Sequence, residues 1–155
     1  MTPAQLPGRL RKLASDVRDR AATDAADAMS QAHQRGVVQS MKGPSPSAPG
    51  TPPARRTGTL ARSVQVQPAV LTGPGRATGS VGPHTVYARI QQLGGDIYPV
   101  RAKALHWKQG GKDRFARHVR LPARPYMVMT DARRQECRSA AVDAVRAVVR
   151  EALSG

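Results

Sequence analysis

The sequence predicts an α+β fold in which two long helices enclose a small, mostly antiparallel sheet of about four strands with a short helix. Apolar residues recur every three or four positions near both ends of the chain, which is typical of amphipathic helices. Between these ends, alternating polar and apolar residues are interrupted by glycine-rich turns, which is typical of strands. Because the strands are clustered rather than alternating with helices, an α+β arrangement is favoured over a parallel doubly wound sheet.

Residues 1–36 are predicted to form one long helix that ends at Gly36. Its apolar side chains lie on one face, at Leu6, Leu10, Leu13, Val17, Ala21, Ala25, Met29 and Ala32. At 1.5 Å per residue the helix would be roughly 45 Å long, too long to pack on a small core along its whole length. Its alanine-rich second half suits close packing against another helix, within one subunit or between two.

Residues 37–57 are predicted to form a proline-rich linker or loop. The stretch 42–53 contains five prolines in twelve positions. Proline has no backbone donor and fixes φ, so this stretch can be neither a helix interior nor a central strand. Two interpretations remain open, a disordered tether and a segment that becomes ordered when it docks on a neighbour.

Residues 58–155 are predicted to form the α+β core, beginning with a hairpin and a short helix. Residues 63–67 alternate polar and apolar side chains, as a half-buried strand does. A turn at residues 73–79 leads to a return strand near Val81. The short helix lies within residues 85–93 and is ended by Gly94 and Gly95.

The rest of this core is predicted to contain two more strands and the closing helix. The strands are expected at residues 97–100 and 115–121, with a loop tip at residues 109–113 between them. The helix is expected from Tyr126 or Asp131 to Leu153. Its inner stripe consists of Ala141, Val145, Val148 or Val149, and Ala152, and its arginines form the solvent face.

Composition limits the classes of protein that fit. Only 39% of the residues are hydrophobic and 3% aromatic, which predicts a modest core that depends on partner subunits. No apolar run approaches the roughly 18–20 residues that a membrane span requires, and no secretory signal is readable. A single cysteine, Cys137, excludes an internal disulfide.

No catalytic residue, cofactor or metal site is predicted, so an enzyme is not expected. The histidines (His33, His84, His106 and His118) lack the spacing of zinc ligands. The glycine-rich turn lacks the Gly-Lys-Ser/Thr of a phosphate-binding loop. Trp107 is expected to anchor a core or an interface, and Cys137 to be a small buried residue.

Positive charge is concentrated in the middle of the chain. The formal net charge is +15, and residues 41–130 hold fourteen basic side chains against two acidic ones, a net charge of +12. Such a concentration attracts polyanions or acidic partner surfaces, and both interpretations remain open. The candidate contact residues are Arg101, Lys103, Lys108, Lys112, Arg114, Arg117 and Arg120.

Four segments occur in a characteristic order, namely 57–64, 87–95, 104–107 and 121–127. The residues that carry the pattern are Gly58, Leu60, Tyr87, Ala88, Leu93, Gly94, Gly95, Arg124 and Pro125. This succession resembles the tail-completion and head–tail joining (neck) proteins of long-tailed double-stranded DNA bacteriophages, a group that includes tail terminator and minor tail proteins. Pro125 is expected to start the last helix, and Arg124 to pair with a carboxylate or carbonyl. The short helix is expected to pack onto the sheet through Tyr87, Ile90 and Leu93.

The resemblance implies a structural virion protein located in the neck or tail, and in the host cytoplasm during assembly. It implies a homo-oligomeric ring, expected to be a hexamer, without a cofactor and without a membrane partner. Its partners would be the head connector or stopper and the tail tube or terminator, with transient contact to DNA phosphates in the lumen. The alternative is a small basic protein that contacts DNA phosphates non-specifically.

Overall fold

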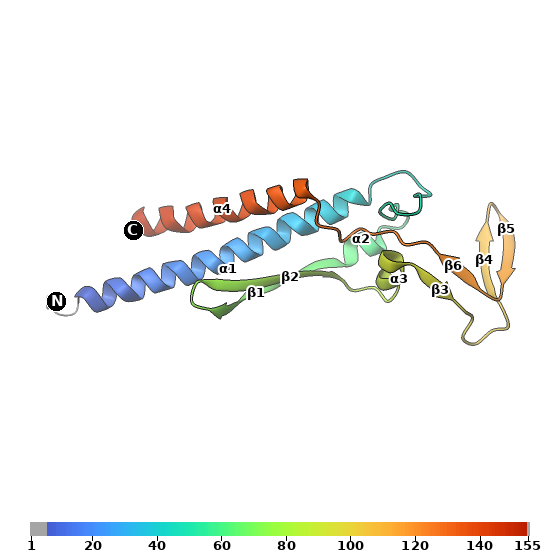
Figure 1. Cartoon of the computed structure of the whole chain (residues 1–155), viewed down its shortest axis with the longest axis horizontal. Helices are drawn as coiled ribbons and strands as arrows, with labels where there is room; N and C mark the ends of the chain where they lie inside the picture. The colour runs from blue at the N-terminus through green and yellow to red at the C-terminus, as the bar shows by residue number, and fades with distance from the viewer. Residues whose placement is uncertain (1–5, 155) are drawn as a thin grey trace.

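Two antiparallel helices form the body of an elongated molecule (Figure 1). The computed structural model describes residues 6–154. The helices are α1 (Leu6–Ser40), α2 (Thr59–Ser63), α3 (Ala88–Leu93) and α4 (Asp131–Ser154). The strands are β1 (Val64–Gly73), β2 (Arg76–Pro83), β3 (Gly95–Ile97), β4 (Leu105–Gln109), β5 (Lys112–Ala116) and β6 (Val119–Leu121). The expected α+β class, with a long helix near each end of the chain and antiparallel strands between them, is confirmed.

Helix α1 is packed on two sides at once. Its 35 residues span about 52 Å, with α4 along one side and the β1–β2 hairpin along the other (Figure 1). Residues 21–28 are all half-buried, because their mostly small side chains allow α4 and the hairpin to approach from different directions. None of the helices within residues 6–154 has the length and apolar character that a bilayer span requires.

Three polar side chains of α1 fasten the β1–β2 hairpin to it. Gln34 Nε2 donates to the Val64 carbonyl at 2.8 Å, and the Asp27 carboxylate accepts from the Ala69 amide at 2.7 Å. Asp19 accepts from the Gly75 amide at 2.8 Å. Spacings of seven and eight residues place these side chains on one helix face. The β1–β2 register is irregular between Gln67 and Val70. Asp27 therefore accepts from an amide in the part of β1 where regular pairing is interrupted.

The densest core lies where α1 ends. Its buried side chains come from α1 and the residue after it, from α2, from β1 and from the segment before α4: Val37, Met41, Ala61, Val64 and Tyr126. The loop between α1 and α2 folds back over this core. The Arg55 amide donates to the Met41 carbonyl at 2.9 Å, and the Gly50 amide to the Ala123 carbonyl at 2.9 Å. The proline-rich segment is therefore packed against its own chain.

The remaining strands extend away from the helical body. β3 pairs with β6 and β4 pairs with β5, both antiparallel, and together residues 95–121 form what we call the distal arm (Figure 1). The described strands therefore number six, in three separate pairs, rather than about four in one small sheet. The strand expected at residues 115–121 is interrupted at Arg117 and His118, and the one expected at 97–100 is replaced by Gly95–Ile97.

Helix α1 does not end at Gly36, as the sequence predicts, but continues to Ser40. Gly36 has a different role, since a Cβ there would lie 2.7 Å from Arg133 Nε. Arg133 of α4, expected on the solvent face, is buried and donates to the carbonyls of Gly36, Tyr126 and Val128. The absence of a side chain at Gly36 thus allows an arginine to join α1 to α4.

The last helix also differs from expectation. It begins at Asp131, so Pro125 lies in the extended segment before it and does not start it. Of its expected inner stripe Val148 is buried, whereas Val145 and Val149 are exposed. The buried line of α4 instead includes Arg133 and Cys137, because these face α1.

Candidate anion-binding surface

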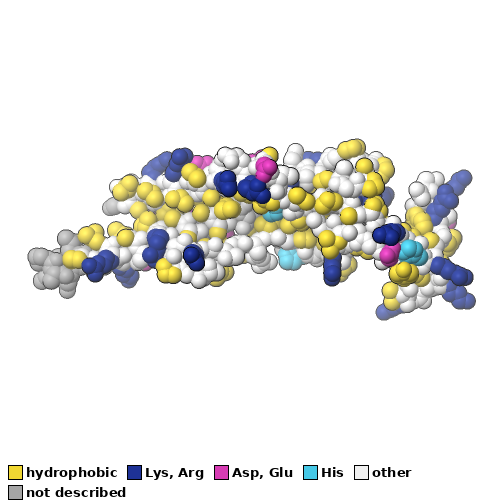
Figure 2. All heavy atoms as spheres, viewed as in Figure 1, with side chains coloured by type: hydrophobic (Ala, Val, Ile, Leu, Met, Phe, Trp, Pro, Cys, Tyr) yellow, Lys and Arg dark blue, Asp and Glu magenta, His cyan; other side chains and the backbone are white. Residues whose placement is uncertain are grey.

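The structure gathers all seven candidate contact residues on the distal arm. Each side chain is exposed, and the seven come from the loop after β3, from β4, β5 and β6, and from the link between the last two strands. Figure 2 shows Lys and Arg side chains projecting from this end of the molecule. Local strand pairing brings these cations together, because β3 and β6 hold the ends of the arm side by side.

The two carboxylates of the arm are both bound to histidines. His106 Nε2 lies 2.7 Å from Asp113 Oδ1, and His118 Nε2 lies 2.8 Å from Asp96 Oδ1. Among the described residues, no Lys or Arg of the arm lies within 4.0 Å of a carboxylate. The positive charge of the arm is therefore not neutralised by close ion pairs and is available to attract an anion.

Aromatic rings stack on histidines within the arm and add exposed flat surface. The His106 ring stacks on Phe115 with centroids 4.7 Å apart, and Tyr98 stacks on His118 at 4.8 Å. Trp107 lies directly opposite Arg114 in the β4–β5 pair and is 38% exposed. Trp107 therefore does not anchor a core, and its expected role at an interface stays a prediction.

The three glycines among the pattern residues all have positive φ angles. Gly58 precedes α2 with a φ of 78°, and Gly94 follows α3 with a φ of 69°. A Cβ at Gly94 would lie 2.6 Å from the Ala123 amide nitrogen, so a side chain would push away the segment between β6 and α4. The Gly94 amide also donates to the Ile90 carbonyl at 2.9 Å and caps α3. Gly95, with a φ of 146°, continues this reversal.

The other pattern residues divide into packed and exposed ones. Ala88 is buried, and Leu60 packs against the main core. Leu93 is 63% exposed and Tyr87 is also exposed, so the expectation that they pack the short helix onto a sheet is wrong. Arg124 Nη2 donates to the Ser47 carbonyl at 3.4 Å, which is the carbonyl partner expected of it.

A separate cluster lies between α1 and α4. Burial, and secondarily the charge of Arg133, lower the pKa of His33. Burial raises the pKa of Cys137, whose thiol donates to the Met29 carbonyl at 3.5 Å, so the expected small buried cysteine is confirmed. Within residues 6–154, no three His, Cys, Asp or Glu side chains are grouped so that they could hold a metal ion.

The sequence matches no protein-family model, and no match was found among curated proteins or solved structures. The interpretation therefore depends on the geometry of the molecule. That geometry offers an elongated helical body and, at one end, an arm with exposed cations and aromatic rings. Such a surface is suited to binding anionic or acidic macromolecules.

Proposed function

We propose that this protein is a structural subunit of a bacteriophage neck, which forms a ring that joins or completes the tail at the head–tail interface around the DNA channel. The single observation that carries the assembly into an oligomer is the amount of surface left uncovered. The chain exposes 11160 Å² of accessible surface, whereas a compact monomer of its mass of 16.6 kDa exposes about 7,600 Å². The excess of about 3,600 Å² is in the range that permanent oligomers bury.

The character of that surface supports subunit contacts. Eighteen large hydrophobic side chains are exposed among the described residues, against nine buried hydrophobic ones, of which three are alanines. One flank of α4 carries an exposed apolar stripe at helical spacing, consisting of Val142, Val145, Val149 and Leu153. Hydrophobic side chains are spread along the visible face of the helical body (Figure 2). Exposed apolar residues at this density favour burial against copies of the same chain.

The link to a phage neck comes from the resemblance of roughly residues 57–150 to head–tail joining proteins. In that setting the distal arm would face either the lumen, where DNA phosphates pass, or acidic loops of neighbouring ring proteins. Charge reversal at Arg114, Arg117 and Arg120 distinguishes a lumen-facing arm from an arm that binds a neighbouring protein. Loss of head–tail joining with normal DNA passage identifies a protein partner, and the reverse result identifies the lumen.

The experiment is sedimentation velocity of the purified protein over a hundredfold concentration range, with negative-stain electron microscopy of the heaviest species. We expect a concentration-dependent shift from monomer to one closed species that is visible as a ring. A monomer at every concentration, with a sharp and concentration-independent melting transition, contradicts the proposal.

A variant tests the α4 stripe directly. The double substitution Val145→Ser and Val149→Ser should shift the assembly to higher concentration, because it removes exposed apolar surface without touching the buried line of α4. The matched control is Ala147→Ser, which changes an exposed residue of the same helix outside the stripe. Equal assembly of all three proteins would exclude this stripe as the subunit contact.

The second candidate function is non-specific DNA binding, which the unpaired cations of the arm favour. Its test is titration of the monomer with duplex DNA at about 150 mM salt, where weak phosphate contacts are screened. Tight, saturable binding by the monomer would favour this function over the ring.

A further inference from the structure

A cleft of about 620 Å³ opens between the loop after α1, α2 and the start of α3. Three arginines line it, Arg55, Arg56 and Arg124, and no Asp or Glu lines it. Its walls also carry hydroxyl and amide groups and apolar side chains, the latter including Met41, Pro53 and Leu60. Gln109 borders it from the β4–β5 hairpin. The volume is that of a ligand site, and all of its charged side chains are positive.

The guanidinium of Arg124 is only partly satisfied. Among residues 6–154, its buried Nε has no hydrogen-bond partner and its Nη2 donates to the Ser47 carbonyl at 3.4 Å. Its backbone is fixed, because the Arg124 amide donates to the Gln91 carbonyl at 2.8 Å. A buried donor on a charged group is costly while it is unpaired, and a negative charge in the cleft beside Arg124 would offset part of that cost through its attraction to the guanidinium.

At the cleft wall, Gly58 leaves room for the guanidinium groups of Arg55 and Arg62 to lie beside it. A Cβ at Gly58 would lie 2.8 Å from Arg62 Nη1 and 3.0 Å from Arg55 Nε, so both guanidinium groups lie close to this glycine. Arg62 Nη1 donates to the Thr57 carbonyl at 3.1 Å, whereas Arg55 and Arg56 have no carboxylate partner among the described residues.

We infer that this cleft binds a short peptide segment of a partner protein that carries carboxylate side chains. Arginine forks match carboxylates in a bidentate geometry, and three of them line one concave site. The half-buried Leu60 and the exposed Tyr87 line the cleft and offer apolar surface to hydrophobic side chains beside the acidic ones. The phosphate backbone of a duplex has no such apolar side chains. The inference stands whether or not the protein forms a ring.

The test uses fluorescence polarisation of a fluorescein-labelled six-residue peptide of alternating glutamate and leucine, at about 150 mM salt. The same peptide with glutamine in place of glutamate is the charge control. We expect the glutamate peptide to bind at least about tenfold more tightly. The double variant Arg55→Gln and Arg56→Gln should weaken that binding by about tenfold or more, and because both side chains are exposed it should fold normally.

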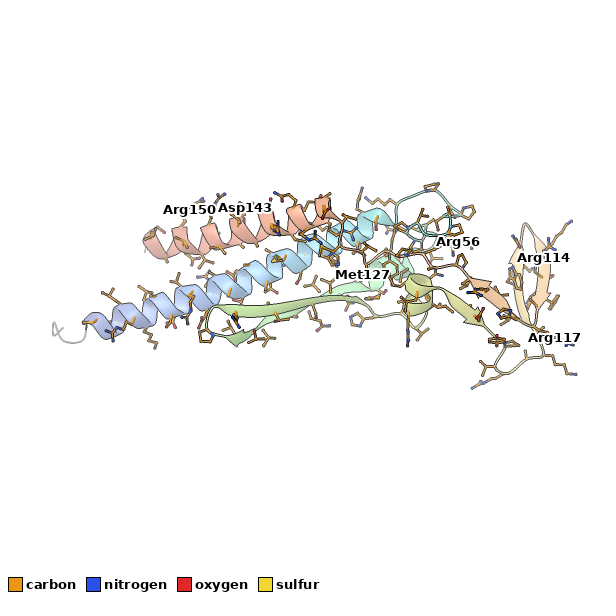
Figure 3. The ribbon with its side chains drawn as sticks, viewed as in Figure 1. Arg56, Arg114, Arg117, Met127, Asp143 and Arg150 are labelled. Atoms are coloured by element: carbon orange, nitrogen blue, oxygen red, sulfur yellow. The ribbon has the colours of Figure 1, made fainter. Side chains whose placement is uncertain are left out.

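The matched control is Arg138→Gln with Arg150→Gln, which removes the same charge from exposed positions of α4, where Arg150 lies at the end of the molecule far from Arg56 (Figure 3). This control should leave peptide affinity within about twofold. Equal losses in both double variants, or equal affinity for the two peptides, would overturn the inference. Stronger binding of duplex DNA or inorganic phosphate that depends on Arg55 and Arg56 would overturn it as well, since the site would then be a phosphate site.

A third variant, Arg124→Gln, completes the test, and its thermal melting is measured to show whether it folds. In a folded Arg124→Gln protein, peptide affinity should fall by about tenfold or more, because the cleft then loses a guanidinium whose Nε has no acceptor among the described residues. Unchanged affinity in that folded variant contradicts the inference. If Arg124→Gln does not fold, the peptide affinity of the Arg55→Gln and Arg56→Gln double variant decides whether the inference holds.

Discussion

At the scale of single residues, Arg133 joins α1 to the start of α4 through hydrogen bonds to three backbone carbonyls. It is 8% exposed, and its guanidinium donates to carbonyls in α1 and in the segment before α4. Gly36 makes this possible by leaving room beside Nε. A buried arginine that saturates backbone carbonyls avoids the penalty of an unpaired charge and fixes the register of two helices.

The first prediction concerns this arginine and its neighbour. Arg133→Ala should lower the free energy of unfolding by about 3 kcal/mol, because three carbonyls lose their donor and a cavity forms. Arg134→Ala should cost less than about 0.5 kcal/mol, because that exposed side chain pairs only with Asp131. Urea unfolding of the two variants measures the difference. Similar costs would show that the buried contacts of Arg133 contribute little.

The second prediction concerns pH. Because the pKa of His33 lies below its ordinary value of 6.5, the unfolded state binds more protons than the folded state just below that value. The free energy of unfolding should therefore fall as the pH drops through about 6.5. The pKa values of Asp19 and Glu151 are lowered by hydrogen bonds from Arg18 and Arg20, so both carboxylates stay charged through this range.

Urea unfolding at about pH 7.5 and about pH 5.5 tests this. His33→Gln should show a smaller difference between the two pH values than the unmodified chain. The control is His84→Gln, which alters an exposed histidine and should keep the full difference. An unchanged pH dependence in His33→Gln would assign the effect to other groups.

At the scale of elements, the β1–β2 hairpin depends on α1 through polar contacts as well as packing. Asp19, Asp27 and Gln34 are spaced along one face of α1 and bind backbone groups of the hairpin from its tip to its base. An isolated two-stranded hairpin is marginally stable in water, so these contacts and the packing on α1 determine whether it forms.

The third prediction tests the middle contact. Asp27→Ala should raise the hydrogen-exchange rate of the Ala69 amide about tenfold or more, because that donor then loses its acceptor. Asp24→Ala, which removes only a long surface pair with Arg20, should leave Ala69 unchanged. Exchange measured by NMR separates the two. Equal exchange in both variants would mean that the hairpin does not need this hydrogen bond.

Sequence periodicity predicted the long helices because the information for them is local. The predicted end of the first helix at Gly36 was wrong. Gly36 contacts Arg133, which is far along the chain, and this contact overrides the ordinary preference of glycine for helix ends. The prediction of a single sheet was wrong for a similar reason, because β3 pairs with β6, which lies later in the chain, and not with the β1–β2 hairpin before it. The basic arm was predictable because its cations are close in sequence. The arginine-lined cleft was not, because Arg55 and Arg124 meet only after folding.

At the scale of the whole molecule, the distal arm and the helical body are separate in structure and, we expect, in role. The body holds the main core and the apolar stripe of α4, whereas the arm holds exposed cations and its own stacked aromatic pairs. Arg114 and Arg117 lie at the end opposite Arg150 of α4 (Figure 3). If assembly belongs to the body and anion binding to the arm, each can be removed without the other.

The fourth prediction tests this division by replacing residues 98–118 with Asn-Gly. Ile97 and Val119 are paired across β3 and β6, so a two-residue turn can close them into a short hairpin. The melting temperature should change by less than about 4 °C, because the deleted segment lies outside the main core. Sedimentation should still show the same assembly, whereas the salt concentration that elutes the protein from a heparin column should fall markedly. A large loss of thermal stability would contradict the division, because the arm would then be part of the core. An unchanged heparin elution would also contradict it, because the dominant cations would then lie outside the arm.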